Sequence, residues 1–144
     1  MSELRIETVE MHTGGEPVRL VEGKWVNPVW SPDGRMIVYA GRSLVGQVDL
    51  AAVRPDRVPV PLPGMRVRPG GYRFLPDSSG LVYLPRIHSP DFWALDFATG
   101  LTRPLTRFGN HGTLRTFDIT PDGQFIVFDR SRQNSDIVLI ELPK

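Results

Sequence analysis

Short apolar runs recur in pairs along the chain, and a tight polar turn divides each pair. The runs are residues 25–30 and 36–40, residues 72–75 and 81–84, and residues 117–119 and 125–128. Two short apolar runs around a tight turn predict a β-hairpin. No segment shows a sustained apolar period of about 3.6 residues. The pattern therefore predicts an all-β chain without a substantial helix.

The three turns share a proline followed by an aspartate. The turn residues are Pro32, Asp33 and Gly34 in the first, Pro76, Asp77 and Gly80 in the second, and Pro121, Asp122 and Gly123 in the third. Proline presets φ at the first central position of a type I turn, aspartate suits the second, and glycine adopts the positive φ that follows. The second copy is expected to be looser and two residues longer. The repetition of aspartate at the same turn position indicates that each of the three is a structural turn residue and neither a catalytic group nor a calcium ligand.

The turns repeat at a nearly constant period, since 44 residues separate Pro32 from Pro76 and 45 separate Pro76 from Pro121. A period in this range is typical of a β-propeller with one copy in each four-stranded blade. The sequence thus predicts a single partial propeller domain over residues 1–144, with about three antiparallel blades and an N-terminal two-stranded unit. These units are residues 1–22 (two strands), 23–64 (a blade), 65–108 (a blade) and 109–144 (a three-stranded blade).

Each blade is expected to contain strands A to D in order. In the first blade they are residues 26–30, 36–40, 45–50 and a segment within 58–62; in the second, 72–75, 81–84, 92–97 and 103–106; in the third, 116–120, 125–129 and 137–142. Prolines 55, 59, 61 and 63 crowd the last strand of the first blade. Proline cannot donate to a ladder, so this strand is expected at an outer edge or as irregular chain. The N-terminal unit is expected to pair residues 4–11 with residues 17–21 around a turn at residues 12–15.

An acidic residue stands within each expected third strand. These residues are Glu10, Asp49, Asp96 and Glu141, with separations of 39, 47 and 45 residues. A carboxylate among apolar neighbours is costly unless it is satisfied. The repetition favours a structural role and predicts that Glu10 and Asp96 occupy the same register position.

Composition limits the classes of protein that the chain can belong to but indicates no activity. The 144 residues suffice for one domain, and 40% hydrophobic with 23% charged residues fit a globular protein. A net charge of +1 offers no global argument for binding nucleic acid or a membrane. The absence of cysteine excludes disulfides, thiolate metal sites and cysteine catalysis. No apolar run approaches the roughly 18 residues of a membrane span, and no signal peptide is evident, so a cytoplasmic location is expected.

Candidate chemical groups are scattered. His12, His88 and His111 are far apart, next to turn residues, and lack the short ligand spacing of a zinc site. The segment at residues 41–45 lacks the second glycine of a nucleophile elbow. No catalytic residue, metal or cofactor is therefore expected.

Arginines cluster in two places. Arg66, Arg68 and Arg73 surround a glycine turn at residues 69–71, while Arg130 and Arg132 flank a later loop. Solvated loop charge is the favoured interpretation, and an acidic partner or anionic ligand is the alternative.

With these turns and strands identified, residues 17–144 resemble the TolB-like propeller repeat, also called the WD-like repeat. The resemblance rests on "PVWSPDGRMIVYAG", "YRFLPDSSGLVYL" and "FDITPDGQFIVFDRSRQNSDIVLIELP". The last stretch is similar to the terminal blade of propellers attached to bacterial serine/threonine kinases. Proteins of this repeat serve as partner-binding modules, as gates beside hydrolase domains of the prolyl oligopeptidase type, and as stand-alone proteins.

The N-terminus has a second resemblance. The stretch "TVEMHTGGEPVRLV", residues 8–21, is similar to the opening of the proline racemase and hydroxyproline epimerase family. That family uses a catalytic cysteine pair, or a cysteine and a threonine, in a much longer chain. This chain has no cysteine, so the activity does not carry over. A third and fourth strand of a TolB-like blade is the favoured interpretation of this stretch.

The resemblance and the residues together predict a non-catalytic protein-interaction or scaffold module, expected to be a C-terminal piece of a larger propeller. The alternative is a small-ligand-binding or hydrolytic propeller with its site in the central channel, or an accessory domain of a kinase or peptidase. A channel enzyme needs ionisable groups where the inner strands begin. Those positions hold Trp25, Val26, Tyr72, Arg73, Thr116 and Phe117, which offer little acid or base chemistry.

The blade count predicts self-association. Closed propellers have 4 to 8 blades, and this chain supplies just over three. An open arc leaves apolar faces at its ends. A homodimer that completes a six-blade ring is expected, with a poorly stable fragment as the alternative.

Overall fold

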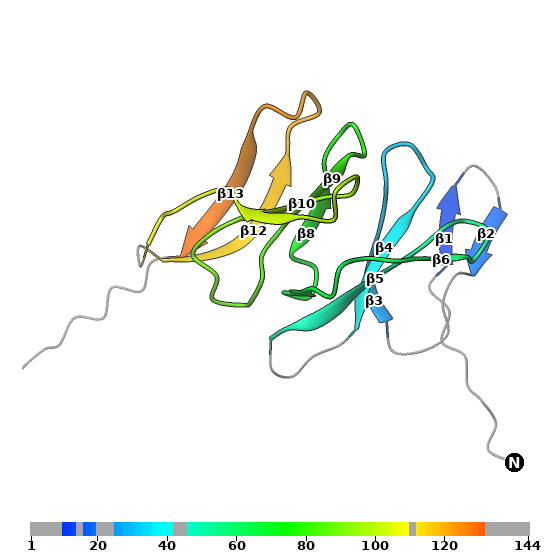
Figure 1. Ribbon diagram of the computed structural model, residues 1–144, viewed down its shortest axis with the longest axis horizontal. Helices are drawn as coiled ribbons and strands as arrows, with labels where there is room; N and C mark the ends of the chain where they lie inside the picture. Colours follow the sequence, from blue (N-terminus) through cyan, green and yellow to red (C-terminus); the bar gives the residue numbers. More distant parts are fainter. Residues whose placement is uncertain (1–9, 14–15, 20–24, 42–45, 110–111, 132–144) are drawn as a thin grey trace, which may run out of the picture.

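The computed structural model shows a chain built of short β-strands (Figure 1). It describes residues 10–13, 16–19, 25–41, 46–109 and 112–131. Every regular element in these ranges is a strand, and every strand pair is antiparallel. The prediction of an all-β chain is confirmed for this part of the protein. No helix in these ranges is long and apolar enough to span a membrane.

The first sheet contains β3 (Trp25–Trp30), β4 (Ile37–Gly41), β5 (Val48–Val53) and β6 (Pro59–Val60) in that order. A further strand, β7 (Arg66–Val67), pairs with the opposite end of β5. The sequence predicts one outer strand within residues 58–62, whereas the structure has two short strands, β6 and β7, along this edge of the sheet. Pro61 and Pro63 lie in the gap between β6 and β7, where they have no N–H to give to the ladder.

The middle sheet contains β8 (Tyr72–Phe74), β9 (Gly80–Tyr83), β10 (Trp93–Asp96) and β11 (Thr102–Pro104), in the spatial order of the chain. The last sheet is the hairpin of β12 (Thr113–Ile119) and β13 (Ile126–Ser131), with a bulge between Leu114 and Phe117. A separate hairpin pairs β1 (Glu10–Thr13) with β2 (Glu16–Arg19). His12 and Thr13 thus belong to a strand and not to the expected turn. The third strand expected at residues 137–142 lies outside the described residues.

The first, middle and last sheets stack in chain order, and the middle sheet is covered on both faces (Figure 1). Successive side chains of a strand point to opposite faces. Along β9, Leu81 and Tyr83 join the core shared with the first sheet, whereas Val82 joins the core shared with the last sheet. The facing residues are Val38, Ala40 and Leu50 on the first sheet and Leu114 and Phe117 on the last.

The three Pro-Asp turns have the same backbone geometry. The N–H groups of Ser31, Leu75 and Thr120 donate to the carbonyl oxygens of Met36, Gly80 and Phe125, at 2.8, 2.9 and 2.9 Å. The left-handed position of each turn falls on Gly34, Ser78 and Gly123, with φ of 70°, 61° and 71°. The expectation that the second turn is two residues longer is wrong, because Ser78 adopts the positive φ and Gly80 is already the first residue of β9.

Gly80 is required by a close approach between strands. It lies opposite Asp96 in the ladder of β9 and β10. A Cβ at this position would lie 2.1 Å from the carbonyl oxygen of Leu95. Since that atom belongs to the backbone, a side chain fits only if β10 moves. Glycine is needed here for space and not for its φ angle.

The acidic residues of the third strands are not equivalent, which corrects the expected register. Leu81 faces Leu95 just as Ile37 faces Val53, so Asp96 corresponds to the residue after Val53, which is Arg54. Asp49 lies near the other end of β5, opposite Arg66. The third strand consequently spans Val48–Val53 and not residues 45–50.

A lone carboxylate cannot set register, because half the positions of such a strand are exposed and accept it. The other two acidic residues do not restore the expected register. Glu10 begins β1, which pairs only with β2 among the described strands. Glu141 lies outside the described residues.

Replacement of Gly80 by alanine should destabilise the protein strongly. The new Cβ would overlap the Leu95 carbonyl and force β9 and β10 apart, so we expect a loss of about 2–3 kcal/mol in the free energy of unfolding, as for overpacked cores. Urea denaturation measures this loss.

Gly64→Ala is the matched control, because a Cβ at Gly64 meets no atom within 4 Å. Its effect should stay within about 0.5 kcal/mol. Equal effects of the two substitutions would contradict the close approach.

Candidate functional site

The carboxylate of each turn aspartate closes its own turn. Asp33, Asp77 and Asp122 accept the backbone N–H two residues further on, at 3.1, 2.9 and 3.0 Å. Each also accepts a hydroxyl hydrogen, from Ser31, Ser79 and Thr120 respectively, at 2.6, 2.6 and 2.5 Å. These hydrogen bonds, the hydroxyl bond first, hold the pKa of all three carboxyl groups below the ordinary value. The aspartates are thus engaged within the turns.

The turns lie side by side at one edge of the molecule, at the top of Figure 1. The backbone N–H of Asp33 donates to the hydroxyl of Ser78 in the next turn, at 3.1 Å. On the other side, a Cβ at Gly123 would lie 3.5 Å from the ring of Pro76. The three turns form a continuous ridge, whose neighbours are one repeat apart in sequence.

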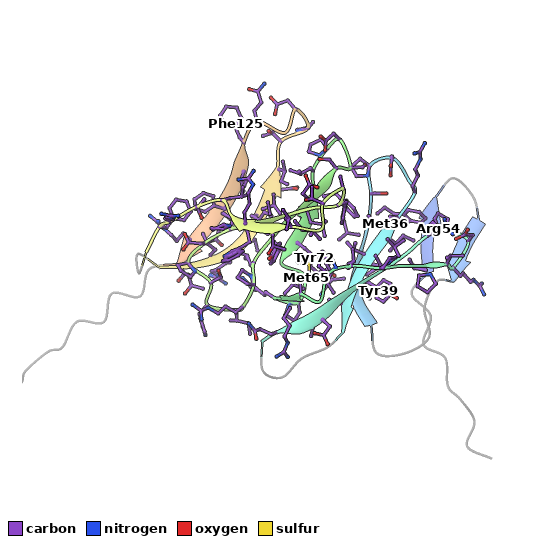
Figure 2. All side chains as sticks on the ribbon, in the orientation of Figure 1. Met36, Tyr39, Arg54, Met65, Tyr72 and Phe125 are labelled. Carbon is purple, nitrogen blue, oxygen red and sulfur yellow. The ribbon has the colours of Figure 1, made fainter. Side chains whose placement is uncertain are left out.

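Tyr72 links the first and middle sheets through a buried phenol (Figure 2). Its hydroxyl donates to the carbonyl oxygen of Asn27 at 2.5 Å. Asn27 has a φ of 55° and lies where the β3–β4 register shifts, between Val26 and Val29. Burial raises the pKa of the Tyr72 phenol, so the group stays a neutral donor. The bulge in β3 presents a carbonyl to the neighbouring sheet.

Arg68 connects the chain after β7 to the last sheet. Its Nη1 donates to the carbonyl oxygens of Leu114 and Arg115, at 2.8 and 2.7 Å. Its backbone N–H donates to the carbonyl of Leu84 at 2.7 Å. Burial is the first cause of a lowered pKa for Arg68, followed by the nearby charge of Arg115, yet a guanidinium stays charged at neutral pH. Arg68 therefore acts as a clamp between sheets.

The other arginines of this cluster also have partners within the fold. Arg73 lies 3.7 Å from the carboxylate of Asp118, with its guanidinium 5.6 Å from the centre of the Phe117 ring. Arg66 lies 3.8 Å from Asp49. Arg130 stands over the ring of Phe108, also at 5.6 Å, and Arg132 is outside the described residues. Arg66, Arg73 and Arg130 therefore have partners within the fold.

An open groove of about 490 Å³ lies at the loops that precede β5 and β10, lined by Gln47, Arg86, Ile87 and His88. The side-chain amide of Gln47 donates to the carbonyl of Pro85 at 2.9 Å. Ile87 packs against Gly46, where a Cβ would lie 2.5 Å from the end of the isoleucine. The groove combines a guanidinium, an imidazole and an amide, and the described residues that line it include no carboxylate and no nucleophile.

Sequence reasoning singled out His88 but missed Gln47 and Arg86. They belong to loops that come together only through the stacking of the first and middle sheets, and neither loop has a distinctive motif.

The three histidines do not form a metal site in the part of the chain that is described. His88 is exposed in the groove, His12 lies in β1, and His111 is outside the described residues. Within the described ranges no group of three histidine, cysteine or acidic residues could hold a metal ion. Of the inner-strand positions, Tyr72 and Phe117 are buried in the two cores, and Thr116 is exposed.

Comparison with known proteins adds no relationship: no protein-family model and no curated protein matches the chain. The TolB-like and racemase-like resemblances stay predictions from the sequence.

The turn aspartates predict acid sensitivity. A carboxyl group whose pKa is lower in the folded state than in the unfolded chain stabilises the fold above its unfolded pKa, and that contribution is lost as the pH falls through the folded value. With unfolded aspartate near pH 3.9, the free energy of unfolding should decline as the pH drops below about 4.

The variant with Asn at positions 33, 77 and 122 tests this, because asparagine keeps the acceptor oxygen but does not titrate. We expect it to be less stable at pH 7 and to show a shallower decline between about pH 5 and 2. Denaturation curves across this range measure both effects. Parallel curves for the two proteins would contradict the assignment.

Arg68→Met should cost about 2 kcal/mol of unfolding free energy, because the part-buried carbonyl of Leu114 and the exposed carbonyl of Arg115 lose a charged donor. Arg66→Met, two residues earlier, removes an exposed ion pair and a long, exposed hydrogen bond to the Gln47 carbonyl and should change stability by less than about 0.5 kcal/mol. Chemical denaturation compares the two variants. A cost for Arg68→Met no larger than that of Arg66→Met would show that the clamp does not stabilise the fold.

Proposed function

We propose that this chain is a non-catalytic protein-interaction module of the propeller type, built from TolB-like repeats, which completes its assembly by associating with a second copy. The observation that carries the proposal is an open stack of three sheets, in which neighbouring sheets contact each other at separations close to one repeat of 44 or 45 residues.

The contacts between sheets support a radial repeat. Tyr72 bonds to Asn27, Ser78 bonds to Asp33, and Asp118 pairs with Arg73. The two residues of each pair are 45 positions apart. These contacts join neighbouring sheets at a separation close to the 44 and 45 residues between the turns, and Arg68 likewise reaches residues 46 and 47 positions further on. Contacts between adjacent units about one repeat apart are typical of propellers and related repeat proteins.

The open end of the stack, at the last sheet, supports association. A propeller closes with 4 to 8 blades, and the described strands form three stacked sheets with one further hairpin. Each interior sheet face of a repeat protein is buried by its neighbour, so an end without a neighbour favours a partner. A second copy of this chain would supply that partner.

The polar groups of the described residues favour a non-catalytic role. The turn aspartates, Tyr72 and the arginines of the central cluster are engaged in contacts within the fold. At the groove near Arg86 and His88, the lining residues within the described part of the chain include no nucleophile and no carboxylate. It suits recognition of a polar partner group better than acid–base or nucleophilic chemistry.

Self-association should be visible as a dependence of mass on concentration. We expect sedimentation velocity to show a shift from monomer to dimer as the protein is raised from about 1 to 100 μM, a range that covers micromolar dissociation constants. Thermal unfolding at the same concentrations should show a rising midpoint, because association stabilises the folded state by mass action. A cooperatively folded monomer at every concentration would contradict the proposal.

A further inference from the structure

Three valines occupy equivalent positions in the second strands of the three sheets. Val38 is opposite Val29, Val82 opposite Arg73, and Val127 opposite Asp118. Val38 is 0% exposed and Val82 is 2% exposed, whereas Val127 is 64% exposed. The same residue type at the same register position is thus buried twice and exposed once.

The difference follows from what covers each position. Val38 lies in the core between the first and middle sheets, and Val82 lies in the core between the middle and last sheets. In β13, Ile126 packs towards the middle sheet, and the ring of Phe128 lies 5.4 Å from that of Phe92. Alternation then directs Val127 to the opposite side, where no described strand follows.

Phe125 extends this exposed face. It corresponds to Met36, which packs against the core between the first and middle sheets. Phe125 is itself 64% exposed, and Figure 2 shows it at the turn end of the last hairpin, just before β13, directed away from the other sheets. Val127 thus stands at a position whose counterparts are buried between sheets, and Phe125 at one whose counterpart in the first sheet, Met36, is partly buried against the core.

We propose that this outer face of the last sheet, centred on Phe125 and Val127, binds the same face of a second copy about a two-fold axis. The inference rests on the proposed self-association and names the surface that performs it. In the two earlier sheets the position of Val127 is covered by the next sheet along the chain, so a sheet of a second copy is the partner that fits.

The buried outer side of the first sheet, at the other end of the stack, is the reason to expect that the face pairs with an identical face. Ile37 and Val53 lie opposite each other in the first sheet and alternate with the residues of the shared core, so they point away from the middle sheet. They are only 1% and 5% exposed. The first sheet therefore offers no open apolar surface at these positions to receive Val127 from another chain. A symmetric contact between identical faces remains, which is the common form of a dimer.

The face also carries charge at its margin. The Asp118 carboxylate, next to Val127 in the ladder, lies 3.7 Å from Arg73, so its charge is partly balanced. Asp129 is exposed two residues beyond Val127. An apolar centre with polar groups around it is the usual composition of an interface.

The test is a pair of matched substitutions analysed by sedimentation. Val127→Asp should raise the dimer dissociation constant at least tenfold. Leu101→Asp is the control, because Leu101 is 70% exposed on the turn between β10 and β11, away from β13; it should leave the constant within twofold of wild type. If the two variants dimerise equally well while wild type also dimerises, the face is wrong but self-association stands. If wild type does not dimerise at all, the proposed function fails as well.

A crosslinking experiment tests the symmetry without relying on a loss of binding. The chain has no cysteine, so a disulfide in Val127→Cys can form only between two chains. We expect mild oxidation to crosslink this variant at concentrations where it dimerises, and not to crosslink Leu101→Cys. Dimerisation that depends on Val127 without crosslinking of Val127→Cys would overturn the two-fold pairing and indicate contact with a different face.

Discussion

Four consecutive apolar residues, 81–84, require burial on both faces of the middle sheet, and the arrangement of the other described sheets depends on this requirement. All four are buried, although a strand sends successive side chains to opposite faces. A sheet with such a strand needs cover on both sides. The first sheet covers one face and the last sheet covers the other. The stacking order, the two cores and the position of β12 and β13 all follow from this two-sided burial.

Apolar burial brings sheets together but does not fix their register, since it has no direction. Directional contacts supply the register here. The phenol of Tyr72 reaches a carbonyl that is available because β3 bulges at Asn27, and Arg68 holds two carbonyl groups of β12. A donor in one repeat thereby meets an acceptor in the next. These contacts join residues 45 to 47 positions apart, close to the spacing of the three turns, so each sheet is tied to the sheet of the neighbouring hairpin.

The need to bury apolar sheet faces also explains where the molecule can bind a partner. Val127 is exposed on the last sheet, at a position whose counterparts in the preceding sheets are buried, and Phe125 is exposed beside it. The polar side chains that sequence alone marks as candidates for chemistry, the turn aspartates and the central arginines, are engaged in holding turns and sheets. Binding capacity therefore lies in an apolar sheet face and an open groove, which suits an interaction module.

The sequence by itself determined the all-β class and the positions of the three central hairpins, because proline and aspartate act on the φ angles and hydrogen bonds of their own turn and alternation is a property of a single strand. Only the tertiary structure decided the details that depend on a neighbour. Ser78 adopts a positive φ where a glycine was expected, with its hydroxyl bonded to the preceding turn. Gly80 is needed because a strand distant in sequence passes within contact distance. The register of β5 depends on its pairing with β4 and β7. The clamp at Arg68 depends on carbonyl groups of β12, about one repeat away. No local pattern specifies such partners.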